Sequence, residues 1–85
     1  MSVYDSRRVA LAFGAVLKLA RKGAGLSQET LAEHAELDRT TPSLYERGLR
    51  QPTIGTVLAL ARALNLDPAV LVRLLVARLL GRDAP

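Results

Sequence analysis

One stretch, residues 27–48, constrains the fold of this sequence more than any other. Ser27 is a favourable helix N-cap, because its hydroxyl oxygen can accept a hydrogen bond from a backbone N–H of the first helical turn. Leu31, Ala32 and Ala35 then recur at the spacing of a single helical face. The residues after Ser27 therefore predict a short amphipathic helix.

A second short helix is predicted after a brief break. Asp38 is a further N-cap candidate, and Gly48 stands where a helix can end with a positive φ. Local rules would instead place the cap at Thr41 and Pro42 at the first helical position, because proline lacks the N–H that would bond to the Asp38 carbonyl. That alternative leaves a very short helix, so we expect a start at Asp38 with a loosened first turn. Two short helices joined by such a turn form a helix-turn-helix, whose second helix enters the major groove of DNA.

Two motifs in this region, L-S-Q-E-x-L-A and S-x-x-E-R-G-x-R-x-P, resemble the Cro/lambda-repressor (XRE-like) helix-turn-helix family of bacterial and phage regulators. The resemblance extends over about residues 13–71, and it implies an all-α fold, a five-helix lambda-repressor-like DNA-binding domain. The matching positions are Leu26, Ser27, Gln28, Glu29, Leu31, Ala32, Ser43, Glu46, Arg47, Gly48, Arg50 and Pro52.

Two residues depart from the family pattern. Glu36 stands where the family often has glycine, at a position that can require a positive φ. Either the turn has a different geometry here, or Glu36 is mildly strained. Pro42 replaces a branched apolar residue, which adds to the ambiguity at the start of the second helix.

Length and composition indicate one small domain over residues 1–85, near the lower limit for a self-sufficient core. Without cysteine there is neither a disulfide nor a thiolate zinc site, and a net charge of +4 is compatible with a polyanionic partner. No apolar run reaches the roughly 18 residues of a membrane span, and the start lacks the order of a signal peptide. We expect a cytoplasmic bacterial or phage protein with no membrane partner.

The first helix is expected to begin at a cap on Asp5 or Ser6 and to contribute Phe13 and Leu17 to the core. Val16 and Leu19 project from a different face. Burial against the C-terminal helix or the N-terminus is the favoured interpretation for them, ahead of a partner surface.

Thr53 is expected to cap a helix that closes the core and ends at Asn65, which tolerates the left-handed conformation. Its core residues are expected to be Ile54, Val57, Leu60, Ala61 and Leu64.

The C-terminal helix, about residues 68–80, begins with the cap and first-turn pair Asp67 and Pro68. It is apolar almost all round, so a small domain cannot cover it completely. Leu71 and Leu75 should face the protein's own core. A homodimer interface is expected to use some of four other apolar residues: Val72, Val76, Leu79 and Leu80. A competing account folds this helix over the first one in a monomer.

The resemblance also implies roles for individual residues. Arg21 should pair with Glu46, and Arg50, followed by Arg47, should bind DNA phosphates. Gln28 begins its helix, where free N–H groups favour a phosphate, so we interpret it as a contact to the DNA backbone.

The second helix of the motif should present four side chains to DNA. Arg39 can bind O6 and N7 of guanine, and Leu44 can contact a thymine methyl group. Thr40 and Ser43 can reach bases or phosphates.

These features favour a sequence-specific transcriptional regulator that binds double-stranded DNA as a homodimer on a palindromic operator. The alternative is an antitoxin, or another regulator that binds a protein partner through its C-terminal helix. The sequence has no catalytic constellation and predicts no enzyme, no cofactor and no metal site. It does not separate phage repressors, antitoxins and restriction-modification controllers, and it does not specify the operator or the direction of regulation.

Overall fold

The structure is a computed structural model that describes residues 2–81, and within these residues it contains five α-helices and no strand. The all-α class and the five helices predicted from the sequence are confirmed. The helices are α1 (Ser6–Gly23), α2 (Gln28–His34), α3 (Thr41–Glu46), α4 (Ile54–Ala63) and α5 (Pro68–Leu79).

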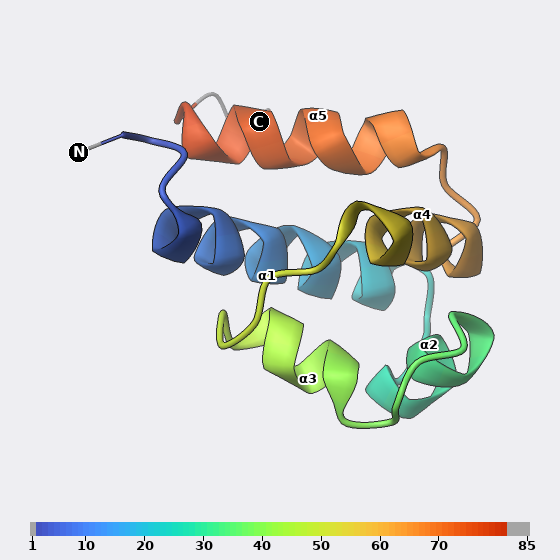
Figure 1. Ribbon diagram of the computed structural model, residues 1–85. Helices are drawn as coiled ribbons and strands as arrows, with labels where there is room; N and C mark the ends of the chain where they lie inside the picture. The colour runs from blue at the N-terminus through green and yellow to red at the C-terminus, as the bar shows by residue number, and fades with distance from the viewer. Residues whose placement is uncertain (1, 82–85) are drawn as a thin grey trace.

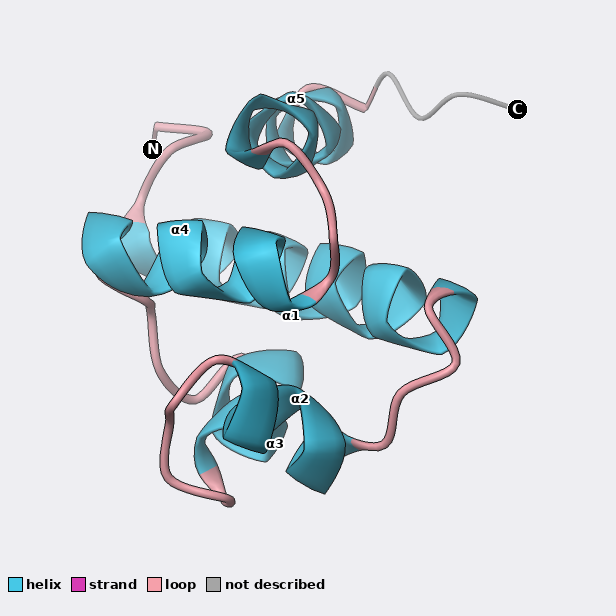
Figure 2. Ribbon diagram, turned by 90° about the vertical axis from the view of Figure 1, so that its right-hand side faces the viewer, coloured by secondary structure: helices cyan, strands magenta, loops and turns pink. Residues whose placement is uncertain are grey.

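The long helix α1 lies at the centre of the molecule. It packs against α5 on one side and against α3 on the other, while α4 contacts both α2 and α5. Figures 1 and 2 show the resulting layers, with α5 above, α1 and α4 in the middle, and α2 and α3 below. The helix-turn-helix and α5 therefore occupy opposite sides of α1.

All five helices contribute to one core. The rings of Phe13 and Tyr45 meet edge to face with their centroids 6.1 Å apart, which joins α1 to α3. Aliphatic side chains fill the remaining space, as the low aromatic content predicts. The buried cluster comprises Phe13, Val16, Leu17, Leu31, Ala35, Tyr45, Leu60, Ala61, Leu64 and Leu71.

The contact between α1 and α3 depends on Gly14. A Cβ atom at this position would lie 2.2 Å from the carbonyl oxygen of Tyr45 and 2.9 Å from that of Glu46. The two backbones therefore approach at a distance that only glycine allows. No pattern in the sequence indicated this role of Gly14.

The predicted helix caps are present, because each has a side-chain oxygen that accepts a backbone N–H of its helix. Asp5 caps α1, Ser27 caps α2, Thr53 caps α4 and Asp67 caps α5.

The expected start of the recognition helix at Asp38 is wrong, because α3 begins at Thr41. The Asp38 carboxylate accepts hydrogen bonds from the Thr40 N–H (2.9 Å) and the Thr40 hydroxyl (2.7 Å). The Asp38 carbonyl oxygen accepts a third from the Thr41 N–H (3.0 Å). These bonds close a turn in place of a helical turn, and Pro42 lies inside the first turn of α3, almost fully buried.

Two non-glycine residues adopt positive φ. Glu36 has φ 58°, so the family's turn geometry is kept and Glu36 takes the strained alternative left open by the sequence. Asn65 has φ 59° after α4, as predicted.

Two apolar residues lie outside the core, contrary to expectation. Ile54, in the first turn of α4, is 78% exposed, so its assignment to the core is wrong. Val16 is buried, but Leu19 is 65% exposed because α5, although it lies along α1, does not cover that position. Helical periodicity identified the face of each residue but not how far the neighbouring helix extends.

Candidate nucleic-acid interface

A shallow depression of about 300 Å³ lies on the outer surface of α2 and α3. All of its lining residues except Glu29 were predicted from the sequence as DNA contacts. The lining residues are Gln28, Glu29, Arg39, Thr40, Ser43, Leu44 and Arg47. We call this surface the recognition face.

Helix α3 has one face for the core and another for the recognition face. Thr41, Pro42 and Tyr45 are buried against the rest of the protein. Ser43 and Leu44 are half-buried and line the depression. The short helix is thus held from behind while its outer side chains remain accessible.

Arg39 projects from the turn before α3, and its side chain is 78% exposed. The start of α3 at Thr41 places Arg39 and Thr40 ahead of the helix and not within it. Both residues nevertheless line the recognition face. The error in the helix boundary therefore does not remove either from the candidate site.

Arg50 is exposed but does not line the depression. It lies two residues after Gly48, whose φ is 71°. A Cβ atom added to Gly48 would lie 2.5 Å from a methyl carbon of Leu11, so the chain turns closely against α1 at this point. The pKa of Asp38 is lowered, mainly because the Thr40 hydroxyl and N–H donate to the carboxylate, with smaller contributions from the positive charges of Arg39 and Arg50.

The ion pair of Arg21 and Glu46, implied by the family resemblance, is present behind the recognition face. Arg21 Nε and Nη2 donate to the two carboxylate oxygens of Glu46 at 2.6 and 3.1 Å, and Nη1 donates to the Leu26 carbonyl at 2.8 Å. The two side chains are only 11% and 3% exposed. The hydrogen bond to Glu46 raises the pKa of Arg21 despite the opposing effect of burial.

Gln28 joins this network, which the sequence did not predict. Its Nε2 donates to Glu46 Oε1 at 3.1 Å. An amide nitrogen carries two hydrogens, so one is used inside the protein and one remains for an external acceptor. The carboxylate therefore fixes the orientation of the side chain that was expected to contact the DNA backbone.

Glu29 is the residue on the recognition face that sequence reasoning missed. Its carboxylate lies 3.8 Å from Arg39 Nη2, and both side chains are largely exposed. Its position directly after Gln28, in the first turn of α2, was the available signal.

Helix α5 leaves an apolar strip uncovered on the other side of the molecule. Val72 and Leu80 are exposed, while Val76 and Leu79 are half-buried. Their spacing of four, seven and eight residues from Val72 places them on one helical face. We call these four residues the α5 strip.

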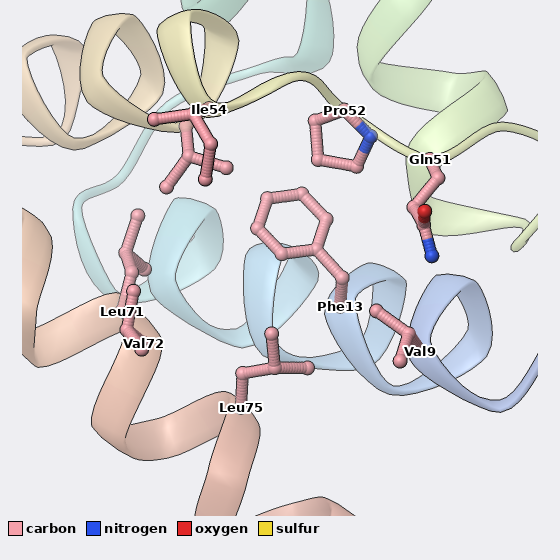
Figure 3. Close-up of a pocket in the computed structure, with 9 residues that line it drawn as sticks. Val9, Phe13, Gln51, Pro52, Ile54, Leu71, Val72 and Leu75 are labelled. Atoms are coloured by element: carbon pink, nitrogen blue, oxygen red, sulfur yellow. The ribbon is translucent and has the colours of Figure 1, made fainter. Parts of the chain in front are cut away.

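A hollow of about 290 Å³ adjoins the α5 strip at Val72. Figure 3 shows Phe13 at its centre, with Leu71, Val72 and Leu75 projecting from α5 and Ile54 from the start of α4. The lining is almost entirely apolar, so the uncovered surface of α5 continues onto its neighbours.

Within residues 2–81, no group of three or more histidine, cysteine or acidic side chains could hold a metal ion. No helix in the same part of the chain is long and apolar enough to cross a membrane.

Residues 12–75 match the family model described as a helix-turn-helix domain. The restriction-modification controller protein C.AhdI from Aeromonas hydrophila is 42% identical, with a TM-score of 0.70 over 73% of this chain and 94% of that one. The controller protein C.Esp1396I, solved as a tetramer with its natural 35 base-pair operator, is 30% identical, with a TM-score of 0.77 over 85% of this chain and 95% of that one. The clp gene regulator ClgR from Corynebacterium glutamicum shares the fold at 22% identity, with a TM-score of 0.80 over 87% of this chain and 79% of that one.

A comparison with curated protein sequences gives no match. The family model nevertheless covers most of the sequence, and two controller proteins match at 30% identity or more over most of their own length. The chain therefore belongs to the helix-turn-helix family, of the Cro/lambda-repressor (XRE-like) type.

Proposed function

We propose that this protein is a sequence-specific DNA-binding transcriptional regulator that acts as a homodimer on a palindromic operator. The carrying observation is the recognition face, which gathers arginines, hydroxyls and an amide on the outer side of a helix-turn-helix. The protein acts by binding and not by catalysis. The similarity to C.AhdI and C.Esp1396I favours a restriction-modification controller among the classes left open by the sequence.

Direct base contacts are assigned to the outer residues of the recognition face. Arg39 can donate two parallel hydrogen bonds to O6 and N7 of guanine, the arrangement that best distinguishes this base in the major groove. Its exposed side chain is free to reach a base edge. Thr40 and Ser43 supply hydroxyls, and Leu44 supplies an apolar contact for a thymine methyl group.

Contacts to the DNA backbone are assigned to residues around that centre. Arg47 and Arg50 are exposed cations on the two sides of Gly48. Gln28 has one amide hydrogen left for a phosphate oxygen after its bond to Glu46. Such contacts fix the register of the protein on the duplex without reading the sequence.

The α5 strip is assigned to the dimer interface. Fully burying an aliphatic side chain is worth about 1.5–3 kcal/mol, and a two-fold dimer would bury the same strip on both subunits. Helix α5, which carries the strip, lies on the side of α1 opposite α3 (Figure 2). Dimerisation there leaves both recognition faces free for two half-sites.

Selection from a random pool of double-stranded DNA tests the proposal. We expect enrichment of an inverted repeat whose half-sites are about one helical turn, roughly 34 Å, apart. Failure to enrich any sequence above the starting pool would overturn the proposed function.

Sedimentation of two matched α5 variants tests the dimer. Leu79→Asp places a charge in the strip, so we expect a folded monomer that binds the palindrome poorly. Leu74→Asp introduces the same change at an exposed position outside the strip and should remain dimeric. A monomeric wild type, or a Leu79→Asp protein that still dimerises, contradicts the assignment. Copurification of a different protein on this helix would support the partner-binding alternative.

A further inference from the structure

Glu29 introduces a negative charge into a surface that is otherwise suited to DNA. It lines the same depression as Arg39 and Arg47, and its carboxylate lies 3.8 Å from Arg39 Nη2. An unpaired carboxylate at this place would repel phosphates. Its position beside Arg39 gives it a more specific role.

We propose that Glu29 is a positioning residue that sets the DNA sequence specificity of the protein by orienting the guanidinium of Arg39. This inference rests on the proposed function. A guanidinium carries five N–H donors, and two suffice for O6 and N7 of guanine. The guanidinium can therefore remain beside the Glu29 carboxylate as an ion pair while two of its N–H groups bind the base.

The effect on cognate DNA follows from side-chain freedom. Arg39 is 78% exposed, and among the side chains of residues 2–81 its ion-pair partner is Glu29. The pair restricts a long flexible side chain to orientations near the recognition face, so less rotamer freedom is lost when the guanine contact forms.

The effect on random DNA has the opposite sign. Non-specific affinity depends on the number of phosphates that the protein neutralises, and a carboxylate in the contact surface opposes that attraction. Glu29 thus favours cognate binding and disfavours non-specific binding. Both effects increase the ratio of the affinity for cognate DNA to the affinity for random DNA.

Glu29→Gln is the test variant, and Glu33→Gln is its matched control. Both changes remove one negative charge from α2, but Glu33 does not line the recognition face. Affinities are measured for the selected operator and for a random duplex of the same length, at the same salt concentration. Thermal unfolding of each variant verifies that all proteins are folded during the measurement.

We expect Glu29→Gln to weaken operator binding, to strengthen random binding, and to lower the ratio of the two by about two- to five-fold, the range of an exposed ion pair. Glu33→Gln should change both affinities by the same factor. In an Arg39→Ala background, Glu29→Gln should no longer weaken operator binding, because the guanidinium that it orients is absent.

Each contrary result has a distinct meaning. Equal behaviour of Glu29→Gln and Glu33→Gln overturns the inference, because only total charge would then matter. A ratio that rises shows that Glu29 competes with the base for Arg39. Weakened operator binding that persists in the Arg39→Ala background makes Glu29 a base contact itself. A wild type without sequence preference overturns the proposed function, and this inference with it.

Discussion

The carboxylate of Glu46 connects three segments of the protein. It accepts two hydrogen bonds from Arg21 near the end of α1 and one from Gln28 at the start of α2, while Glu46 itself ends α3. Arg21 also binds the Leu26 carbonyl between α1 and α2. Removal of one member of a buried charge pair is costly, because it leaves the other charge buried without a counter-charge.

Glu46→Gln tests this network at nearly unchanged shape. The amide leaves the part-buried Arg21 guanidinium without its counter-charge, so we expect the free energy of unfolding to fall by about 3–5 kcal/mol. Chemical denaturation measures the change, with exposed Glu33→Gln as the control. A loss below about 1 kcal/mol would mean that the pair behaves as a solvated surface pair.

At the scale of elements, single-residue chemistry predicted most helix boundaries. Ser27, Thr53 and Asp67 cap their helices as expected, because a cap depends on one side chain and the next turn of backbone. The start of α3 depends instead on whether residues 38–40 form a helical turn or a non-helical turn. The hydrogen bonds from Thr40 to the Asp38 carboxylate favour the non-helical turn, and the sequence pattern did not predict these bonds.

The remaining differences from expectation arise from tertiary packing. Helical periodicity placed Ile54 and Leu19 on faces that were expected to be covered, but no neighbouring element extends over these side chains. The role of Gly14 requires the position of α3, and the bond from Gln28 to Glu46 joins residues that are distant in sequence. The recognition face was predictable because its residues lie within one contiguous motif.

Gly14→Ala tests the contact between α1 and α3. The added methyl group would meet the Tyr45 carbonyl oxygen at 2.2 Å, so the helices must separate. We expect a loss of stability of about 1–3 kcal/mol, as for overpacked cores. Gly23→Ala is the control, since a Cβ there meets nothing within 4 Å. A Gly14→Ala protein as stable as the control would show that the close approach is easily relieved.

Alanine substitutions of Arg39 and Arg50 should distinguish a contact to a DNA base from a contact to the DNA backbone. Arg39→Ala should cost about 1–3 kcal/mol on the selected operator and much less on random DNA. Arg50→Ala should weaken binding to all sequences similarly and flatten the dependence of log K on log salt by about 1. Equal losses on both DNAs reassign Arg39 to phosphate binding, and an unchanged salt slope removes Arg50 from the interface.

At the scale of the whole molecule, α1 separates the two surfaces that we assign to DNA binding and to dimerisation. The recognition face is formed by residues of α2, α3 and the turn between them, and α5 lies on the opposite side of α1 (Figure 1). The body of the protein measures 35 × 25 × 19 Å. The DNA interface and the dimer interface that we propose therefore share no residue.

The proposed dimer makes stability depend on protein concentration. Association binds only the folded state, so the thermal midpoint of the wild type should rise as the concentration increases. Leu79→Asp should show a lower midpoint that does not change with concentration. A wild-type thermal midpoint that does not change with concentration has two explanations: the protein is monomeric, or it is fully dimeric at every concentration tested. Sedimentation at the same concentrations distinguishes them, and a monomer would exclude the dimer.

The division of α3 into an inner and an outer face has an evolutionary consequence. Thr41, Pro42 and Tyr45 attach the helix to the body, whereas Ser43 and Leu44 face outward. Under the proposed assignment, replacement of the outer side chains changes the DNA sequence that the protein prefers and leaves the buried contacts of α3 unchanged. A lineage of such regulators can diverge in what it recognises faster than in how it is built.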